Sequence, residues 1–443
     1  MTAIRHSILG LCLACLVTVA ATSLFGQSPQ SLTAPAQSTP PAPAATDTPK
    51  PHPGDLYKQA MQPLDVVRSS LDNWSDVELG ALAEGIRQAR QECGQSKPED
   101  YAGDDLYDLA RLCALGQDWN TTLTIAQKYL ASGEQGHRAR AYAMTVNALI
   151  QTRDLAQAVD VTKEMLQKLP FDAVVAESAG YLTTYLEHSL DPSAVELASE
   201  QHSLLMEALG KGAPLPEMNG NDAVSVGELY EQGMQFAFLQ RYAGQDDAAV
   251  ATVSDVKSAL AKSAAVSAED QRLIQAVDTR YGLLGAQMPT IEVSKFLVAT
   301  TMKAKIVHDD GLATVYVLFP QWCPQCRKMM KQMTTLAHPP AGPKFLAYGL
   351  MMQGTRSPGE VVPAEDTFKD MQGTSTMLVP QSTAAAFGAI EYPLGVVADR
   401  SGKTRYIGTI TTNAFDPRGF IEQVVSRSSG PKILLVTRLT PIH

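Results

Sequence analysis

The chain from residue 56 to residue 287 carries apolar residues at helical spacing, with few runs that are typical of strands. In LAQAVDVTKEMLQKL, residues 155–169, the apolar positions recur three and four residues apart and therefore share one face of a helix. The segment SDVE at 75–78 is typical of a capping box and predicts a helix from there to about Glu92. We expect this region to form amphipathic helices that pack in pairs.

A weak repeat runs through the helical region. Asp118, Asp154 and Asp191 follow one another at intervals of 36 and 37 residues, close to the tetratricopeptide period of about 34 residues. Residues 141–170 resemble one such repeat, with Ala158 at its small-residue position. The resemblance implies an α-solenoid, and an irregular helical bundle is the alternative. We expect the helices to bind a protein partner, unless they serve only as a scaffold.

The pattern changes after residue 288 to short β-branched runs separated by glycines and turn signals. The apolar run TVYVLF predicts a buried central strand. A helix (KMMKQMTTLA), a second strand (KFLAYGLMM) and a short helix (STAAAFGAI) follow, and then a hairpin that turns at Ser401-Gly402. Strands that alternate with helices predict an α/β domain over residues 288–430. Cys323 and Cys326 then lie at the carboxyl edge of a central strand.

Two thiols three residues apart at that edge suggest redox chemistry. A cysteine in the first turn of a helix lies near free N–H groups and the positive end of the helix dipole, which favour thiolate over thiol. We therefore expect Cys323 to be the reactive sulfur. Cys326 is expected to close a disulfide with it and to resolve mixed disulfides. Arg327 and Lys328 either help to hold the thiolate or are solvated surface charges.

The N-terminal residues have the pattern of a secretory signal, with Arg5 followed by an apolar run from Ile8 to about Ala21. This predicts a signal peptide over 1–26 and an exported protein, periplasmic or extracellular. An uncleaved signal, or lipid attachment at Cys15, would instead tether it to a membrane. No later run reaches the ~18 apolar residues of a membrane span, so none is expected after the signal is removed.

Residues 27–55 contain eight prolines and almost no large apolar residue, so we expect a disordered linker that precedes the helical domain. At the other end, residues 431–443 form a tail to which the sequence assigns no role. The expected order is therefore signal, linker, helical domain, α/β domain and tail.

Loss of the signal peptide would leave four cysteines, which allow three disulfide pairings. Their spacing favours Cys93 with Cys113 and Cys323 with Cys326, and export permits both bonds. A Cys93–Cys113 disulfide would contribute on the order of 3 kcal/mol to stability. Two separate buried thiols are the alternative.

Charge and motif spacing exclude several other functions. A net charge of −10, without a cluster of basic residues, argues against binding to nucleic acid. A c-type haem site needs histidine where Arg327 follows Cys326, and the other thiols lie more than 200 residues from the pair, too far for a local zinc motif. We expect no metal and no cofactor beyond a redox-active disulfide.

WCPQC after an apolar strand, followed by IEYP and LGVVADRSGKTRYIG, resembles the thioredoxin fold. The similarity is greatest to its exported thioredoxin-like branch, related to the alkyl hydroperoxide reductase and thiol-specific antioxidant superfamily, and covers roughly residues 288–428. The resemblance implies that Cys323 is the nucleophile and Cys326 the resolving thiol, and that Pro393 forms a cis peptide bond facing them. The residues that it implies for substrate binding are Trp322, Pro324, Tyr392 and Pro393.

Three positions depart from the thioredoxin pattern. Val317, Met329 and Lys331 stand where thioredoxins carry a buried acid, a glutamate and a helix proline, and Pro320 replaces the threonine that a peroxiredoxin needs. We expect an exported thiol:disulfide oxidoreductase that acts on protein thiols or disulfides with an upstream electron donor or acceptor. The alternative is an interaction or scaffold protein whose thioredoxin-like domain is vestigial or structural. The sequence leaves the direction of electron flow open.

Overall fold

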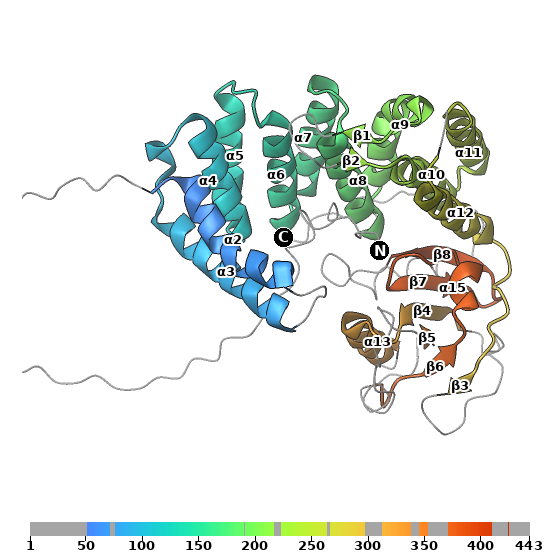
Figure 1. The fold of residues 1–443 in the computed structure, drawn as a ribbon. Coiled ribbons are helices and arrows are strands. Elements are labelled where there is room, and N and C mark those ends of the chain that lie inside the picture. The colour runs from blue at the N-terminus through green and yellow to red at the C-terminus, as the bar shows by residue number, and fades with distance from the viewer. Residues whose placement is uncertain are drawn as a thin grey trace, which may run out of the picture. The chain divides into compact units, whose positions relative to one another are not determined.

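The structure is a computed structural model that describes residues 51–70, 76–189, 191–216, 223–263, 266–296, 312–337, 345–352, 371–409 and 424. The expected signal peptide, most of the expected linker and the C-terminal tail lie outside these residues, as does Ser75 of the expected capping box. The chain divides into two compact units, Met1–Arg153 and Asp154–His443. Figure 1 shows the helices and strands of both units with their labels.

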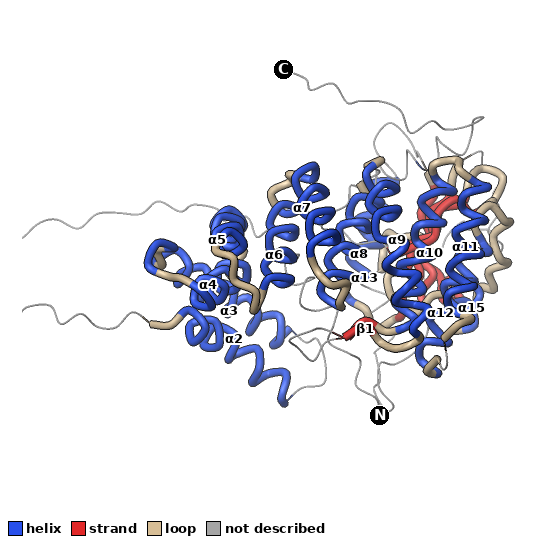
Figure 2. The backbone as a smooth tube through the Cα atoms, turned by 90° about the horizontal axis from the view of Figure 1, so that it is seen from above, coloured by secondary structure: helices blue, strands red, loops and turns tan. Residues whose placement is uncertain are grey.

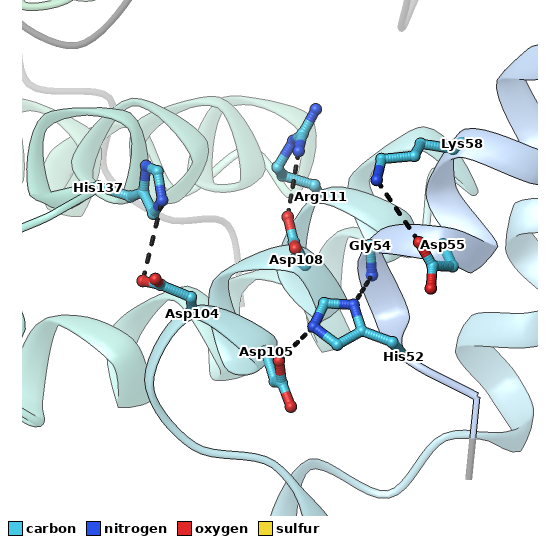
Figure 3. Close-up of polar contacts among 9 residues, drawn as sticks. All are labelled: His52, Gly54, Asp55, Lys58, Asp104, Asp105, Asp108, Arg111 and His137. Atoms are coloured by element: carbon cyan, nitrogen blue, oxygen red, sulfur yellow. Dashed lines mark hydrogen bonds and ion pairs between the residues drawn. The ribbon is translucent and has the colours of Figure 1, made fainter.

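The described residues of the first unit form helices. They are α2 (Pro53–Ser70), α3 (Asp76–Gln95), the short 3-10 helix η3 (Pro98–Asp100), α4 (Gly103–Leu115), α5 (Trp119–Ala131) and α6 (Arg138–Gln151). Their core is built around α4, whose Leu106, Leu109 and Leu112 are buried. Figure 3 shows polar contacts at the start of α4: His52 Nε2 lies 2.6 Å from Asp105 Oδ1, and His52 Nδ1 accepts a hydrogen bond from the Gly54 amide.

The second unit continues with helices and then forms a sheet. Its helical part contains α7 (Leu155–Lys168), α8 (Ala173–His188), α9 (Ser193–Lys211), α10 (Val226–Tyr242), α11 (Asp246–Leu260) and α12 (Ala268–Leu283). A two-stranded ladder, β1 (Leu215–Pro216) with β2 (Ala223–Val224), lies between α9 and α10. No helix in the described part of the chain combines the length and apolarity that a membrane crossing needs.

The three aspartates of the sequence repeat occupy similar places. Asp118 caps α5 by accepting a hydrogen bond from the Thr121 amide, and Asp154 caps α7 in the same way. Asp191 accepts from the Ser193 amide at the start of α9. A carboxylate at such a position satisfies amide groups that have no partner inside the helix. The repeat in sequence thus marks a repeated helix start.

The sheet of the second unit has the strand order β3-β6-β5-β4-β7-β8. Its strands are β3 (Lys295–Phe296), β4 (Thr314–Pro320), β5 (Leu346–Met352), β6 (Thr376–Val379), β7 (Leu394–Ala398) and β8 (Thr404–Thr409). Strands β4, β5 and β6 are parallel, whereas β3, β7 and β8 run antiparallel to their neighbours. In the view of Figure 2, strands of the sheet are visible behind α10 and α11. The expected fold class is confirmed: a helical region precedes a mixed-sheet α/β domain.

Side chains on alternate faces of the sheet build two cores. Val315, Val317 and Phe319 of β4 pack with the helix α13 (Pro324–Ala337). Tyr316 and Leu318 point to the other face, where they pack in one cluster with residues that flank α15 (Ser382–Ala386) and α12. All of β4 is buried because both faces are covered, which explains its continuous apolar sequence. Figure 1 shows α13 and α15 on opposite sides of the sheet.

Candidate functional site

The two cysteines lie where β4 passes into α13. The strand ends at Pro320, and the amide of Gln321 donates to the Met352 carbonyl at 3.0 Å, which extends the pairing with β5 by one residue. The Cys323 amide donates to the Pro320 carbonyl at 3.1 Å, and the helix starts at the next residue, Pro324. Proline suits this position because its fixed φ is helical and a first-turn amide has no partner inside the helix. Cys323 is thus held at the helix N-terminus.

The two sulfurs form a disulfide and differ in exposure. The Cα atoms of Cys323 and Cys326 are 5.3 Å apart. Cys326, in the first turn of α13, is completely buried in the core, whereas Cys323 is only partly buried. The Cys326 amide donates to Cys323 Sγ at 3.2 Å. Cys323 is therefore the more exposed residue of the pair, and its sulfur receives a backbone hydrogen bond, while Cys326 is shielded.

Arg327 binds back onto the turn that precedes the cysteines. Its Nη1 donates to the Gln321 carbonyl oxygen at 2.6 Å, and its amide donates to the Cys323 carbonyl. The neighbouring Lys328 is exposed. The sequence left both as either thiolate supports or solvated charges. The structure distinguishes the two residues: Lys328 is exposed, whereas the Arg327 guanidinium links the first turn of α13 to the turn after β4.

A second loop reaches the same edge of the sheet. The Tyr392–Pro393 peptide bond is cis, as the resemblance implied. The next residue, Leu394, opens β7 and pairs with Leu318 near the end of β4, so the cis peptide lies beside the strand that leads to Cys323. Tyr392 is half-buried against both cores of the domain, and this burial raises the pKa of its hydroxyl.

The remaining expected substrate-binding residues lie in the same two loops. Trp322 is partly buried and directly precedes Cys323, and Pro393 is partly buried. Pro324 begins α13, and its side chain lies outside the described part of the structure. Ile390, which no sequence motif marked as a site residue, is 44% exposed and lies two residues before Tyr392. Its position just before EYP was the only sequence signal for a role at the site, and the exposure of a single apolar residue cannot be predicted from sequence.

Two of the three positions that depart from the thioredoxin pattern hold buried apolar side chains, and the third, Lys331, is exposed. Val317 and Met329 are buried in one core with Cys326. Two apolar side chains thus surround the inner sulfur where the resemblance would place carboxylates. Within the described residues, no group of three or more histidine, cysteine, aspartate or glutamate side chains is arranged to hold a metal ion.

The other disulfide, Cys93–Cys113, lies in the first unit. It joins the end of α3 to α4 across a Cα–Cα distance of 5.1 Å, and the two residues are 2% and 0% exposed. Cys93 Sγ lies 4.0 Å from Asp118 Oδ2, the carboxylate that caps α5. Since both cysteines are buried, the environment of this bond is typical of a structural disulfide.

No protein-family model matches the chain, and no curated protein matches it. Solved structures resemble its α/β domain. MTB DsbF, solved in mixed oxidised and reduced forms, is 18% identical, with 26% of this chain and 82% of that chain covered and a TM-score of 0.21. A thiol-disulfide isomerase from Corynebacterium glutamicum is 15% identical, with coverages of 32% and 97% and a TM-score of 0.26.

A third similar structure is the exposed lipoprotein thioredoxin Etrx1 of Streptococcus pneumoniae strain TIGR4. It is 15% identical, with 26% of this chain and 85% of that chain covered and a TM-score of 0.21. Identities this low concern the fold of a domain alone.

Proposed function

We propose that the protein is an exported thiol:disulfide oxidoreductase that exchanges disulfides with protein substrates through Cys323 and Cys326. The observation that carries the proposal is the difference in exposure across one disulfide at a helix N-terminus. Cys326 is completely buried, and Cys323 is partly exposed and accepts a hydrogen bond from the Cys326 amide. A partner sulfur can therefore approach only the outer cysteine.

The reaction in the reducing direction has two steps. The Cys323 thiolate attacks one sulfur of a substrate disulfide, forms a mixed disulfide and expels the other substrate sulfur as a thiolate. Cys326, after losing its proton, then attacks Cys323 Sγ and releases the second substrate thiolate. The substrate gains two electrons and, after protonation, two protons, and the protein is left as the Cys323–Cys326 disulfide. An upstream thiol donor restores the dithiol, and the reverse sequence oxidises a substrate.

The protein groups on this path have defined tasks. The helix N-terminus and the Cys326 amide favour the thiolate of Cys323. Arg327 fixes the turn by binding the Gln321 carbonyl, so the outer sulfur stays at the start of the helix. Contact with the substrate segment is assigned to Trp322, which directly precedes Cys323, and to Tyr392 and Pro393 of the cis peptide.

The helical region is proposed to bind a partner in the manner of tetratricopeptide-like repeats. The helix starts at which Asp118, Asp154 and Asp191 accept hydrogen bonds from backbone amides support this assignment. Export is proposed from the signal-like residues 1–26. Both assignments can be tested separately from the chemistry, by isolation of bound proteins and by N-terminal sequencing of the mature chain.

A pair of single variants tests the exchange reaction. Cys326→Ser should trap a mixed disulfide between Cys323 and a substrate protein, because the attack that releases the substrate is lost. Cys323→Ser should trap none, because the remaining thiol is buried. The two variants control for each other, since each removes one sulfur atom from the same turn. Equal trapping by both, or full exchange activity of Cys323→Ser, would refute the proposal.

A second function is favoured by one observation. Val317 and Met329 pack around Cys326 with no carboxylate at their positions, as expected of a domain retained for its structure. On this alternative the protein is an interaction scaffold whose Cys323–Cys326 bond is structural. Partner binding that survives loss of both cysteines, combined with no exchange activity in the wild-type protein, would support the scaffold over the enzyme.

A further inference from the structure

The last helices of the helical region cover one face of the sheet. Phe238 of α10, with Leu283 and Leu284 at the end of α12, packs into the same core as Leu318 and Phe387. This is the face opposite α13. The end of the helical region therefore supplies one of the two layers that bury the central strand.

The segment that follows α12 is also paired with the sheet. The Gly285 amide donates to the Thr404 carbonyl, and the Thr404 amide donates to the Ala286 carbonyl, both at 2.8 Å. Met288 continues the pairing with Gly402 at 2.9 Å. The connection from α12 into the sheet is thus hydrogen-bonded along the start of β8, so α12 and the sheet are joined without a free linker.

Gly388 brings α12 into contact with the loop that holds the cis peptide. It is buried and has a φ of 60°, and a Cβ built on it would lie 2.3 Å from the Ala276 carbonyl oxygen and 3.1 Å from Arg280 Cγ. Both contacts belong to α12. No side chain fits there without movement of the loop or the helix. Gly388 lies five residues before Pro393, at the other end of the same loop.

Helix α12 is in turn fixed to α10. Arg280 Nη2 lies 2.7 Å from Glu231 Oε1, and Arg241 Nη1 donates to the Leu284 carbonyl at 3.1 Å. The Arg241 guanidinium also lies 4.8 Å above the Tyr281 ring. These contacts leave α12 little freedom to move apart from α10.

The loop between Gly388 and Leu394 is therefore held at both ends and open in between. Gly388 rests on α12, Ala389 is buried, and Leu394 pairs with Leu318. Ile390 between them is 44% exposed. A shift of α12 would be transmitted to the backbone of Tyr392 and Pro393, which lies beside the end of the strand that leads to Cys323.

We propose that α12 is a brace for this loop, and that Gly388 and Arg280 are positioning residues for disulfide exchange at Cys323. The inference rests on the proposed function and adds a structural connection through which partner binding to the helical region can change the geometry at Cys323. A partner bound to the helices would alter exchange through the position of α12, with no contact to the cysteines.

A matched pair of glycine variants tests the brace. Gly373 has a φ of 80° and no atom within 4 Å of a built Cβ, so Gly373→Ala adds backbone strain without a clash. Gly388→Ala adds similar strain and also the clash with α12. We expect only Gly388→Ala to raise the KM for a protein disulfide, with kcat/KM falling on the order of tenfold or more, as small misplacements of binding groups can cause. Reduction of Cys323–Cys326 by dithiothreitol should remain as in the wild type, because so small a reductant does not use the loop.

Hydrogen–deuterium exchange of residues 388–394 provides a readout that does not depend on activity. The amides of this segment should exchange faster in Gly388→Ala than in Gly373→Ala. Arg280→Glu should have the same effect through loss of the ion pair with Glu231, and the double change Glu231→Arg with Arg280→Glu should restore slow exchange. If the wild-type protein exchanges no protein disulfide, the proposed function fails, and the deuterium data still decide the brace. Equal exchange in both glycine variants, or no rescue by the double change, would overturn it.

Discussion

The Cys93–Cys113 disulfide allows the most quantitative prediction about stability. The bond closes a loop with a sequence separation of 20 residues. The chain-entropy treatment of crosslinks gives about 3 kcal/mol for a loop of that length at 25 °C. We therefore expect Cys93→Ala with Cys113→Ala to lower the free energy of unfolding of the first unit by about 3 kcal/mol. Both sulfurs are buried, so the small cavities they leave act in the same direction.

Urea denaturation can measure this loss in one unit of the chain. Trp119 opens α5, beside the capping residue Asp118 that contacts Cys93. Its fluorescence can be isolated by replacing the other two tryptophans, Trp74 and Trp322, with phenylalanine. The transition reported by Trp119 should move to lower urea concentration with an unchanged slope.

The other disulfide serves as the control for this experiment. Cys323→Ala with Cys326→Ala removes a bond between residues three apart, in the second unit. It should leave the Trp119 transition where it is. A loss below about 1 kcal/mol in the Cys93 and Cys113 variant, well under the chain-entropy value, would refute the reasoning, and so would an equal shift in the control.

Two further changes test the site and the helical region. Arg327→Ala should lower the free energy of unfolding by about 1.5 kcal/mol in a urea titration, because a charged hydrogen bond to the Gln321 carbonyl is lost. The same variant should slow the alkylation of Cys323 by iodoacetamide. Lys328→Ala is the control and should change neither quantity. Burial raises the pKa of Glu187 to about 7 against an ordinary value of 4.5, although the Gln235 amide donates to its carboxylate. The folded state therefore binds the Glu187 proton more tightly than the unfolded state does. This contribution to the free energy of unfolding is fully present below pH 4.5 and is lost as pH rises through 7, by up to about 3 kcal/mol. Glu187→Gln should flatten that decline between pH 5 and 8, and an unchanged pH profile would contradict the assignment.

Local sequence patterns were sufficient where a continuous apolar run or a turn signal defines the element. The run TVYVLF predicted β4 because both faces of that strand are covered, and Ser401-Gly402 predicted the turn between β7 and β8. Strand β6 was missed: its four residues, Thr376–Val379, are too few to show a period. Strand β3, with two residues, gave no signal. The domain boundaries expected from the sequence remain predictions.

The candidate site could be predicted only as far as local chemistry defines it. The spacing of Cys323 and Cys326 and their place before a helix were readable, because both depend on a few adjacent residues. The contact of Gly388 with α12 was not, since it joins segments more than 100 residues apart. The different roles of Arg327 and Lys328 could also be assigned only from the structure. Two adjacent basic residues are equivalent in sequence, and only the structure shows that Arg327 binds a backbone carbonyl.

The central claim is that Cys323 and Cys326 form a reversible redox pair on an accessible edge of the sheet. The most direct test is a titration of the mature protein in glutathione and dithiothreitol buffers, with each cysteine quantified by alkylation and mass spectrometry. We predict a single two-electron transition for Cys323 and Cys326, while the buried Cys93–Cys113 pair stays oxidised in the glutathione buffers and acts as an internal reference. A low potential would identify a reductase and a high one an oxidase. If Cys323 and Cys326 stay unpaired in every buffer, or resist reduction as strongly as Cys93 and Cys113, the account is contradicted.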